Sequence, residues 1–220
     1  MVESLLIPEG GAFITEKFMN LDPEKRKIIL DAAFEEFADY SYEYASTNRI
    51  VKKANIGKGM LFYYFNSKKD LFNYLVEYGI DYIVNDYLSK IDVNERDFIK
   101  RYKQAAMVKM KAYAENPHIF NFLGNLHLNE YTELEEELKG RIFEIKANGF
   151  AVMFNNIDKS LFRDDIDSKE VIRLINLTLA GYEMELTNSL RGKKLSSMNF
   201  DSEWDDFDVF LDLLRQIYYK

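Results

Sequence analysis

The sequence predicts an all-α fold, and three observations support this. Apolar residues recur every three or four positions along most of the chain, which is the spacing of one helical face. Only 3 Pro and 10 Gly interrupt the 220 residues, which argues against a turn-rich β protein. Residues suited to helix starts, such as Asp22 followed by Pro23, precede several of these apolar patterns.

Composition narrows the class of protein. Apolar residues make up 47% of the chain, with 17 Phe and 15 Tyr, so a sizeable core can form. The absence of Cys excludes disulfides and thiolate chemistry. No window reaches the roughly 18 apolar residues of a membrane span, and no export signal is recognisable. We therefore expect a cytoplasmic protein without a membrane partner.

The chain is expected to comprise a leader and two helical domains. Residues 1–20 form a partly irregular leader of open role, 21–68 a small N-terminal domain, and 69–220 a larger C-terminal domain. The small domain opens at Asp22-Pro23-Glu24, where Asp is a good N-cap and Pro suits the first helical position. Apolar residues then follow on one helical face: Ile29, Ala33, Phe37 and Tyr40.

Two short helices come next. One is expected over Thr47–Ala54 with Ser46 as N-cap, and another over Lys58–Phe65. Between them, Asn55-Ile56-Gly57 indicates a tight turn, because Asn and Gly tolerate left-handed backbone. Ser67-Lys68-Lys69-Asp70 resembles a capping box that opens a longer helix.

The larger domain is helical by period. Its helices are expected near 94–115, 117–128, 132–156, 168–190 and 202–219. Pro117 marks one helix start and Gly192 follows a helix end, while Ser168 and Ser202 are the expected N-caps of the last two helices.

Charge is distributed unevenly. The formal net charge is −8, yet no acidic residue occurs from Tyr44 to Lys69. This stretch, the basic segment, contains six cations: Arg49, Lys52, Lys53, Lys58, Lys68 and Lys69. On charge alone, a phosphate-binding face and a solvated helix surface are equally compatible with the pattern.

The order of the short helices favours the first interpretation. Two short helices joined by a tight turn after a preceding helix indicate a helix-turn-helix, whose second helix enters the major groove of DNA. Its reading end would be Gly57, Lys58, Gly59 and Met60, with the small residues admitting close backbone approach. Tyr63 and Tyr64 carry hydroxyls that can donate to phosphate oxygens. We expect three neighbouring side chains in the core: Leu61, Phe62 and Phe65.

Residues 45–71, ASTNRIVKKANIGKGMLFYYFNSKKDL, resemble the signature of the tetracycline-repressor (TetR) family, which usually runs TTVREIAxxAGVSKGTLYYHFxSKEEL. With the preceding helix, the resemblance covers about residues 22–75. It implies DNA contacts at these positions: Thr47, Asn48, Lys58, Gly59, Met60, Tyr63, Tyr64 and Lys68. Departures are Arg49 for an acid, Val51 for Ala, Asn55 for Gly, Gly57 for the Ser N-cap and Met60 for Thr.

The resemblance also implies a pocket for a small, often apolar or cationic effector in the larger domain. Candidate pocket residues are Tyr102, Met110, Tyr113, Phe120, Phe143, Phe150, Met153 and Tyr182. It further implies that the last two helices pair with a second subunit, and their second apolar faces agree with this. The expected dimer contacts are Leu174, Thr178, Tyr182, Phe207, Phe210, Leu214 and Ile217.

These observations predict a ligand-responsive DNA-binding regulator without a cofactor. By the family resemblance it is a repressor that binds a palindromic operator as a homodimer and is released by its effector. An enzyme is not expected, because His118 and His127 are nine apart rather than at the i, i+4 spacing of a helical metal site. A helical ligand-binding or protein-interaction module without DNA binding is the alternative, motivated by the net charge and by Gly57 and Met60.

Overall fold

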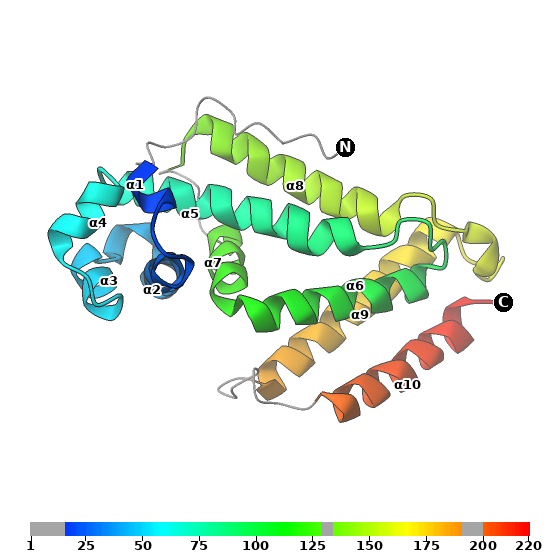
Figure 1. Cartoon of the computed structure of the whole chain (residues 1–220). Helices are drawn as coiled ribbons and strands as arrows, with labels where there is room; N and C mark the ends of the chain where they lie inside the picture. The colour runs from blue at the N-terminus through cyan, green and yellow to red at the C-terminus, as the bar shows by residue number, and fades with distance from the viewer. Residues whose placement is uncertain (1–15, 129–133, 191–199) are drawn as a thin grey trace. The chain divides into compact units, whose positions relative to one another are not determined.

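The computed structural model describes residues 16–128, 134–190 and 200–220. The regular secondary structure of these residues is helical apart from isolated β-bridges such as the one between Phe162 and Tyr219 (Figure 1). The all-α prediction is therefore confirmed. The elements are α1 (Glu16–Met19), α2 (Pro23–Tyr44), α3 (Thr47–Lys53), α4 (Lys58–Tyr64), α5 (Lys68–Tyr82), η1 (Ile83–Tyr87), η2 (Leu88–Lys90), α6 (Phe98–Glu115), α7 (Pro117–Leu128), α8 (Glu136–Phe154), η3 (Lys159–Leu161), α9 (Ser168–Leu190) and α10 (Asp201–Tyr218). Most of the predicted leader and the break at Gly192 lie outside the described residues.

The chain forms two compact units. Unit 1 comprises the residues up to Asp86 together with Asn116–Ala147, and unit 2 comprises Tyr87–Glu115 with Asn148–Lys220. This division groups α5, α7 and the first part of α8 with the N-terminal helices. The predicted domain limits at residues 20 and 68 separate a leader, a helix-turn-helix domain and a larger helical domain. These limits stay a prediction.

Unit 1 is built on an aromatic core. The rings of Phe34 and Phe122 lie 5.3 Å apart, those of Phe72 and Phe122 5.7 Å, and those of Phe37 and Phe72 5.1 Å. They join α2, α5 and α7, which gives the helix-turn-helix a broad support. Gly79 assists this packing, since a Cβ there would meet the Leu123 side chain at 3.2 Å.

Unit 2 has its own core of apolar side chains from α6, α9 and α10. Within it, the fully buried Arg101 donates to the carbonyls of Glu95 at 2.7 Å, Val93 at 2.8 Å, Val152 at 3.1 Å and Asn155 at 2.6 Å. The carbonyls of Val152 and Asn155 are at the C-terminal end of α8. The last carbonyls of a helix have no N–H partner within the helix, and a cation is favourable there. Burial lowers the pKa of Arg101 below its ordinary value.

Several predicted helix starts are confirmed. The Asp22 carboxylate accepts from the backbone N–H of Glu24 at 3.1 Å, and the Ser67 hydroxyl accepts from the N–H of Asp70 at 3.0 Å. Asn55 has a φ of 52°, the left-handed conformation that the turn was expected to use. Within α2, Ser41 is non-helical with a φ of 54°, so the helix is kinked there.

Two expected N-cap residues and two expected helix starts are wrong, although α9 begins at Ser168 as predicted. Asp167, rather than Ser168, accepts from the N–H of Lys169 at 2.8 Å, and Ser202 lies inside α10 with its hydroxyl on Glu203. α6 begins at Phe98 instead of 94, because the Asp97 carboxylate accepts from the N–H groups of Ile99 and Lys100. α8 begins at Glu136 instead of 132. No helix in the described ranges has the length and apolar character to span a bilayer.

Candidate nucleic-acid interface

The turn between α3 and α4 is held from inside. Ile50, Ala54 and Leu61 are 5% exposed or less, and they join α3 and α4 to the core under α2. The N–H of Ile56 donates to the carbonyl of Val51 at 3.0 Å and closes the turn. This packing fixes which side of α4 faces outward.

The leading end of α4 lies on the surface. Lys58 and Gly59 are exposed, and Met60 is 43% exposed. A Cβ added at Gly57 or Gly59 would meet no atom of the described residues within 4 Å. Packing against the described part of the chain therefore requires neither glycine, and the bare backbone of this end is open to an external partner.

The aromatic residues of α4 divide between the two sides of the helix. Leu61 and Phe65 are buried as predicted, but Phe62 is 37% exposed, so its predicted core position is wrong. Only one side of this seven-residue helix contacts the core, and residues 61, 64 and 65 occupy it. Tyr64 is 4% exposed with its ring 5.6 Å from that of Phe18, whereas Tyr63 is 47% exposed. Of these two tyrosines, Tyr63 is placed to meet an external phosphate.

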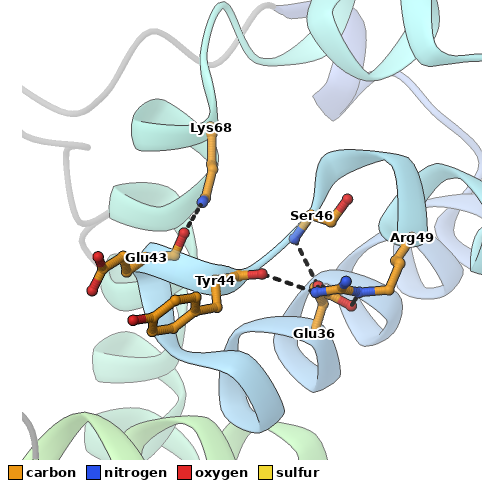
Figure 2. Close-up of polar contacts among 6 residues, drawn as sticks. All are labelled: Glu36, Glu43, Tyr44, Ser46, Arg49 and Lys68. Atoms are coloured by element: carbon orange, nitrogen blue, oxygen red, sulfur yellow. Dashed lines mark hydrogen bonds and ion pairs between the residues drawn. The ribbon is translucent and has the colours of Figure 1, made fainter.

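Glu36 fixes the start of α3, a role that the sequence analysis missed (Figure 2). Its buried carboxylate accepts from the N–H of Ser46 at 2.7 Å and from Nε of Arg49 at 2.8 Å. Arg49 Nη2 also donates to the carbonyl of Tyr44 at 2.9 Å. The hydrogen bond that Arg49 donates to the Glu36 carboxylate raises the pKa of Arg49. Ser46 itself makes no side-chain capping bond, so a carboxylate from α2 replaces the missing capping box.

Lys68 at the start of α5 contacts the end of α2. Its Nζ donates to the carbonyl of Glu43 at 3.2 Å (Figure 2). The same Nζ lies 4.8 Å from the centroid of the Tyr42 ring. The contact joins α5 to the segment that leads into the helix-turn-helix. Lys68 is half-buried there, and the phosphate contact expected at this position stays a prediction.

The basic segment is only partly available as a charged surface. Arg49 pairs with Glu36, and Lys53 pairs with Glu35, both on α2. Lys52, Lys58 and Lys69 are exposed, as is Asn48, while Thr47 is half-buried. The exposed leading end of α4 on unit 1, with Lys58, is the candidate interface.

Residues 29–75 match the family model for bacterial regulatory proteins of the tetR family. This N-terminal segment is therefore similar to the DNA-binding part of tetR-family regulators. Over 50 residues it is 34% identical to the uncharacterized HTH-type transcriptional regulator YhgD of Bacillus subtilis (strain 168), an alignment that spans 23% of this chain and 26% of that relative.

Solved structures extend the likeness of this chain to the whole fold. A TetR family transcriptional regulator from Chloroflexus aurantiacus J-10-fl matches with a TM-score of 0.67 and 21% identity, covering 94% of this chain and 99% of the other. The ketosteroid transcriptional regulator KstR2 of Mycobacterium tuberculosis matches with a TM-score of 0.60 and 17% identity, covering 91% and 97%. At these identities the matches establish the fold alone.

The expected effector-binding residues divide between the two units. Phe120 and Phe143 belong to unit 1, and the other six belong to unit 2. Phe143 is 74% exposed and Phe150 64%, so we remove both from the set that could enclose a ligand. The half-buried members of unit 2 are Tyr102, Met110, Tyr113, Met153 and Tyr182. Burial raises the pKa of Tyr102 above its ordinary value, so its phenol stays protonated.

The last two helices, α9 and α10, present apolar side chains outward. Leu174, Leu177 and Met184 on α9 and Val209, Leu213 and Ile217 on α10 are all exposed. Phe207 and Leu214 were expected to contact a second subunit, but both are buried in the core of their own unit. The 25° stacking of Tyr182 on Phe210, at 4.5 Å, also leaves Tyr182 half-buried within its own chain.

Proposed function

We propose that this chain is a transcription regulator that binds duplex DNA through α4 as a homodimer and that releases it on binding a small molecule. The observation that carries the proposal is the exposed leading end of α4, where Lys58 and Met60 flank a glycine that packing against residues 16–128, 134–190 and 200–220 does not require. An exposed helix end with a cation, a small residue and an apolar side chain suits the major groove.

Each of these residues has a distinct role in DNA binding. Lys58 contacts a phosphate or a guanine edge, Gly59 lets the backbone approach the groove, and Met60 packs on a thymine methyl group. Tyr63, Lys68 and the start of α3 at Thr47 and Asn48 contact the sugar–phosphate backbone and set the register. Glu36 positions α3 without touching DNA.

The homodimer rests on the exposed apolar faces of α9 and α10. A helix that is apolar on a face beyond its own core favours a partner, and Leu177 and Met184 are 58% and 66% exposed. A two-fold dimer would present two copies of α4 to half-sites about 34–36 Å apart on a near-palindromic operator.

The effector is proposed to bind within unit 2 among Tyr102, Met110, Tyr113, Met153 and Tyr182. Their phenols and thioethers suit an apolar or aromatic molecule, or a cation held against a ring. The effector would favour a dimer in which the two α4 helices no longer match the operator, and by linkage DNA would weaken effector binding by the same factor.

Selection from a randomised pool of duplex DNA tests the proposal. We expect the full-length protein to enrich a sequence made of two related half-sites. Enrichment of no sequence by a protein that sedimentation shows to be a folded dimer would instead support the alternative, a helical binding module without DNA binding. For the dimer, Leu177→Glu should yield monomers, whereas Met107→Glu on α6, at a similarly exposed apolar position, should not.

A further inference from the structure

The short helix α1 precedes α2 and is anchored to the core of unit 1 by the aromatic side chain of Phe18. Phe18 of α1 is fully buried, with its ring 4.8 Å from that of Phe65, 5.6 Å from Tyr64 and 5.8 Å from Tyr74. Figure 1 shows α1 beside α4 and the start of α5. Arg26 strengthens the attachment, because its Nη1 donates to the carbonyl of Met19 at 3.2 Å.

This anchor determines where the preceding residue lies. Lys17 is exposed, and its Nζ is 3.9 Å from the centroid of the Tyr63 ring. A cation over a tyrosine face is held by the ring quadrupole. Because Tyr63 lies on the exposed side of α4, the Lys17 ammonium group is placed beside the candidate interface, although 41 positions separate it from Lys58 in the sequence.

Whether a cation keeps its positive charge available to DNA depends on whether its partner within the protein is a carboxylate or an aromatic ring. Glu35 and Glu36 carry negative charges that offset those of Lys53 and Arg49, whereas an aromatic ring holds a cation without neutralising it. A compact ammonium group suits a point contact with a phosphate oxygen. Lys17 therefore adds positive charge to this side of α4 while two cations of the basic segment are offset.

We propose that Lys17, held on the Tyr63 ring by the Phe18 anchor, is a further phosphate-contacting residue, so that α1 extends the DNA interface beyond the helix-turn-helix. This inference rests on the proposed function. It assigns Phe18 and the ring of Tyr63 as positioning groups for the Lys17 ammonium.

The test measures DNA affinity against salt for the full-length protein and a duplex that the wild type selects from a randomised pool. We expect Lys17→Ala to weaken binding to all sequences by about eightfold at 0.1 M salt for each phosphate that Lys17 neutralises, and to flatten the log–log salt slope by about 0.9 for each such phosphate. The matched control is Lys27→Ala, because Lys27 is an exposed lysine on α2 that bonds Asp31. It should leave affinity and slope unchanged.

A double-mutant cycle tests the role of the ring. Tyr63→Phe keeps the aromatic face and Tyr63→Leu removes it, so the effect of Lys17→Ala should stay full in the first background and shrink in the second. An equal effect in both would overturn the positioning by Tyr63. A Lys17→Ala protein that loses thermal stability but keeps the wild-type salt slope would overturn the phosphate contact and leave a structural role. If the wild type selects no duplex, the proposed function itself fails.

Discussion

The carboxylate of Glu36 on α2 lies 2.8 Å from Nε and 2.5 Å from Nη2 of Arg49 on α3. The same carboxylate accepts from the N–H of Ser46, so a single buried group determines both where α3 starts and how it is held against α2. Since α4 packs on α3, the orientation of the proposed reading helix depends on this contact.

The first prediction concerns that carboxylate. Glu36→Leu should lower the free energy of unfolding by about 1–3 kcal/mol, because the Ser46 N–H is left without its acceptor in a buried setting. Glu36→Gln, which keeps an acceptor oxygen, should lower it less. Urea denaturation of the pure protein measures both. Glu35→Gln, which breaks a more exposed pair with Lys53, should cost no more than about 1 kcal/mol. Equal losses for Glu36→Leu and Glu35→Gln would contradict the capping role.

The second prediction separates stability from DNA binding at Gly59. Gly59→Ala should raise the free energy of unfolding by up to about 1 kcal/mol, because Ala is the better helix former and its Cβ would meet no described atom within 4 Å. The same change should weaken operator binding, since the methyl group stands where the backbone approaches the groove. Gly140→Ala on α8 is the matched control, with equally open space around its Cβ. It should stabilise the protein without altering DNA affinity, and a Gly59→Ala protein with wild-type affinity would count against the groove contact.

A third prediction distinguishes base reading from phosphate binding. Lys68→Ala should weaken binding to every duplex alike, since it removes a positive charge beside the DNA phosphates. It should also flatten the dependence of log affinity on log salt. Met60→Ala should instead change the preferred base at one position of each half-site, because it removes an apolar contact with a base edge. Competition among operator variants measures both effects. Uniform loss on all variants after the Met60 change would refute its reading role.

The fourth prediction concerns acid stability in unit 2. Burial works against ionisation of Asp97, but hydrogen bonds from Arg215, the Lys100 N–H and the Tyr219 hydroxyl outweigh it and hold the pKa of Asp97 below its ordinary value. A carboxyl whose pKa is depressed by folding stabilises the folded state above its unfolded pKa of about 3.9 and loses that contribution as pH falls through the folded value.

Asp97→Asn should therefore destabilise the protein near pH 7 and make much less difference at pH 3. Thermal unfolding followed from pH 7 to pH 3 measures the change. Asp212→Asn, at an exposed position on α10, serves as the control and should show no such pH dependence. A gap between the wild type and Asp97→Asn that stays constant with pH would show that the carboxylate charge is not what matters.

Local signals allowed much of the fold to be predicted. The caps at Asp22 and Ser67 and the left-handed turn at Asn55 depend on neighbouring residues in the sequence, and these predictions are confirmed. Ser168 failed as a cap because the adjacent Asp167 offers a charged acceptor to the same helix end. Phe62 failed as a core residue because a helix of seven residues is too short for its apolar period to define one face.

Other features depend on tertiary contacts that no local pattern encodes. Glu36 occupies an inward position of α2 and finds its partners on another helix, so its spacing gave no signal of a cap. Phe18 precedes the first recognisable helix, and its burial requires the aromatic cluster of α4 and α5. Phe207 and Leu214 had the period of an amphipathic helix, but the sequence could not indicate which apolar face of α10 meets its own chain.

The most direct measurement is the equilibrium affinity of the wild-type protein for its selected duplex and for a scrambled duplex across a range of salt. We predict binding at least about 10³-fold tighter to the selected sequence, with log affinity falling linearly as log salt rises. Lys58→Ala should weaken binding to both duplexes and make that fall less steep. Equal affinity for the two duplexes, or an affinity that does not change with salt, would contradict the claim that the exposed end of α4 reads DNA.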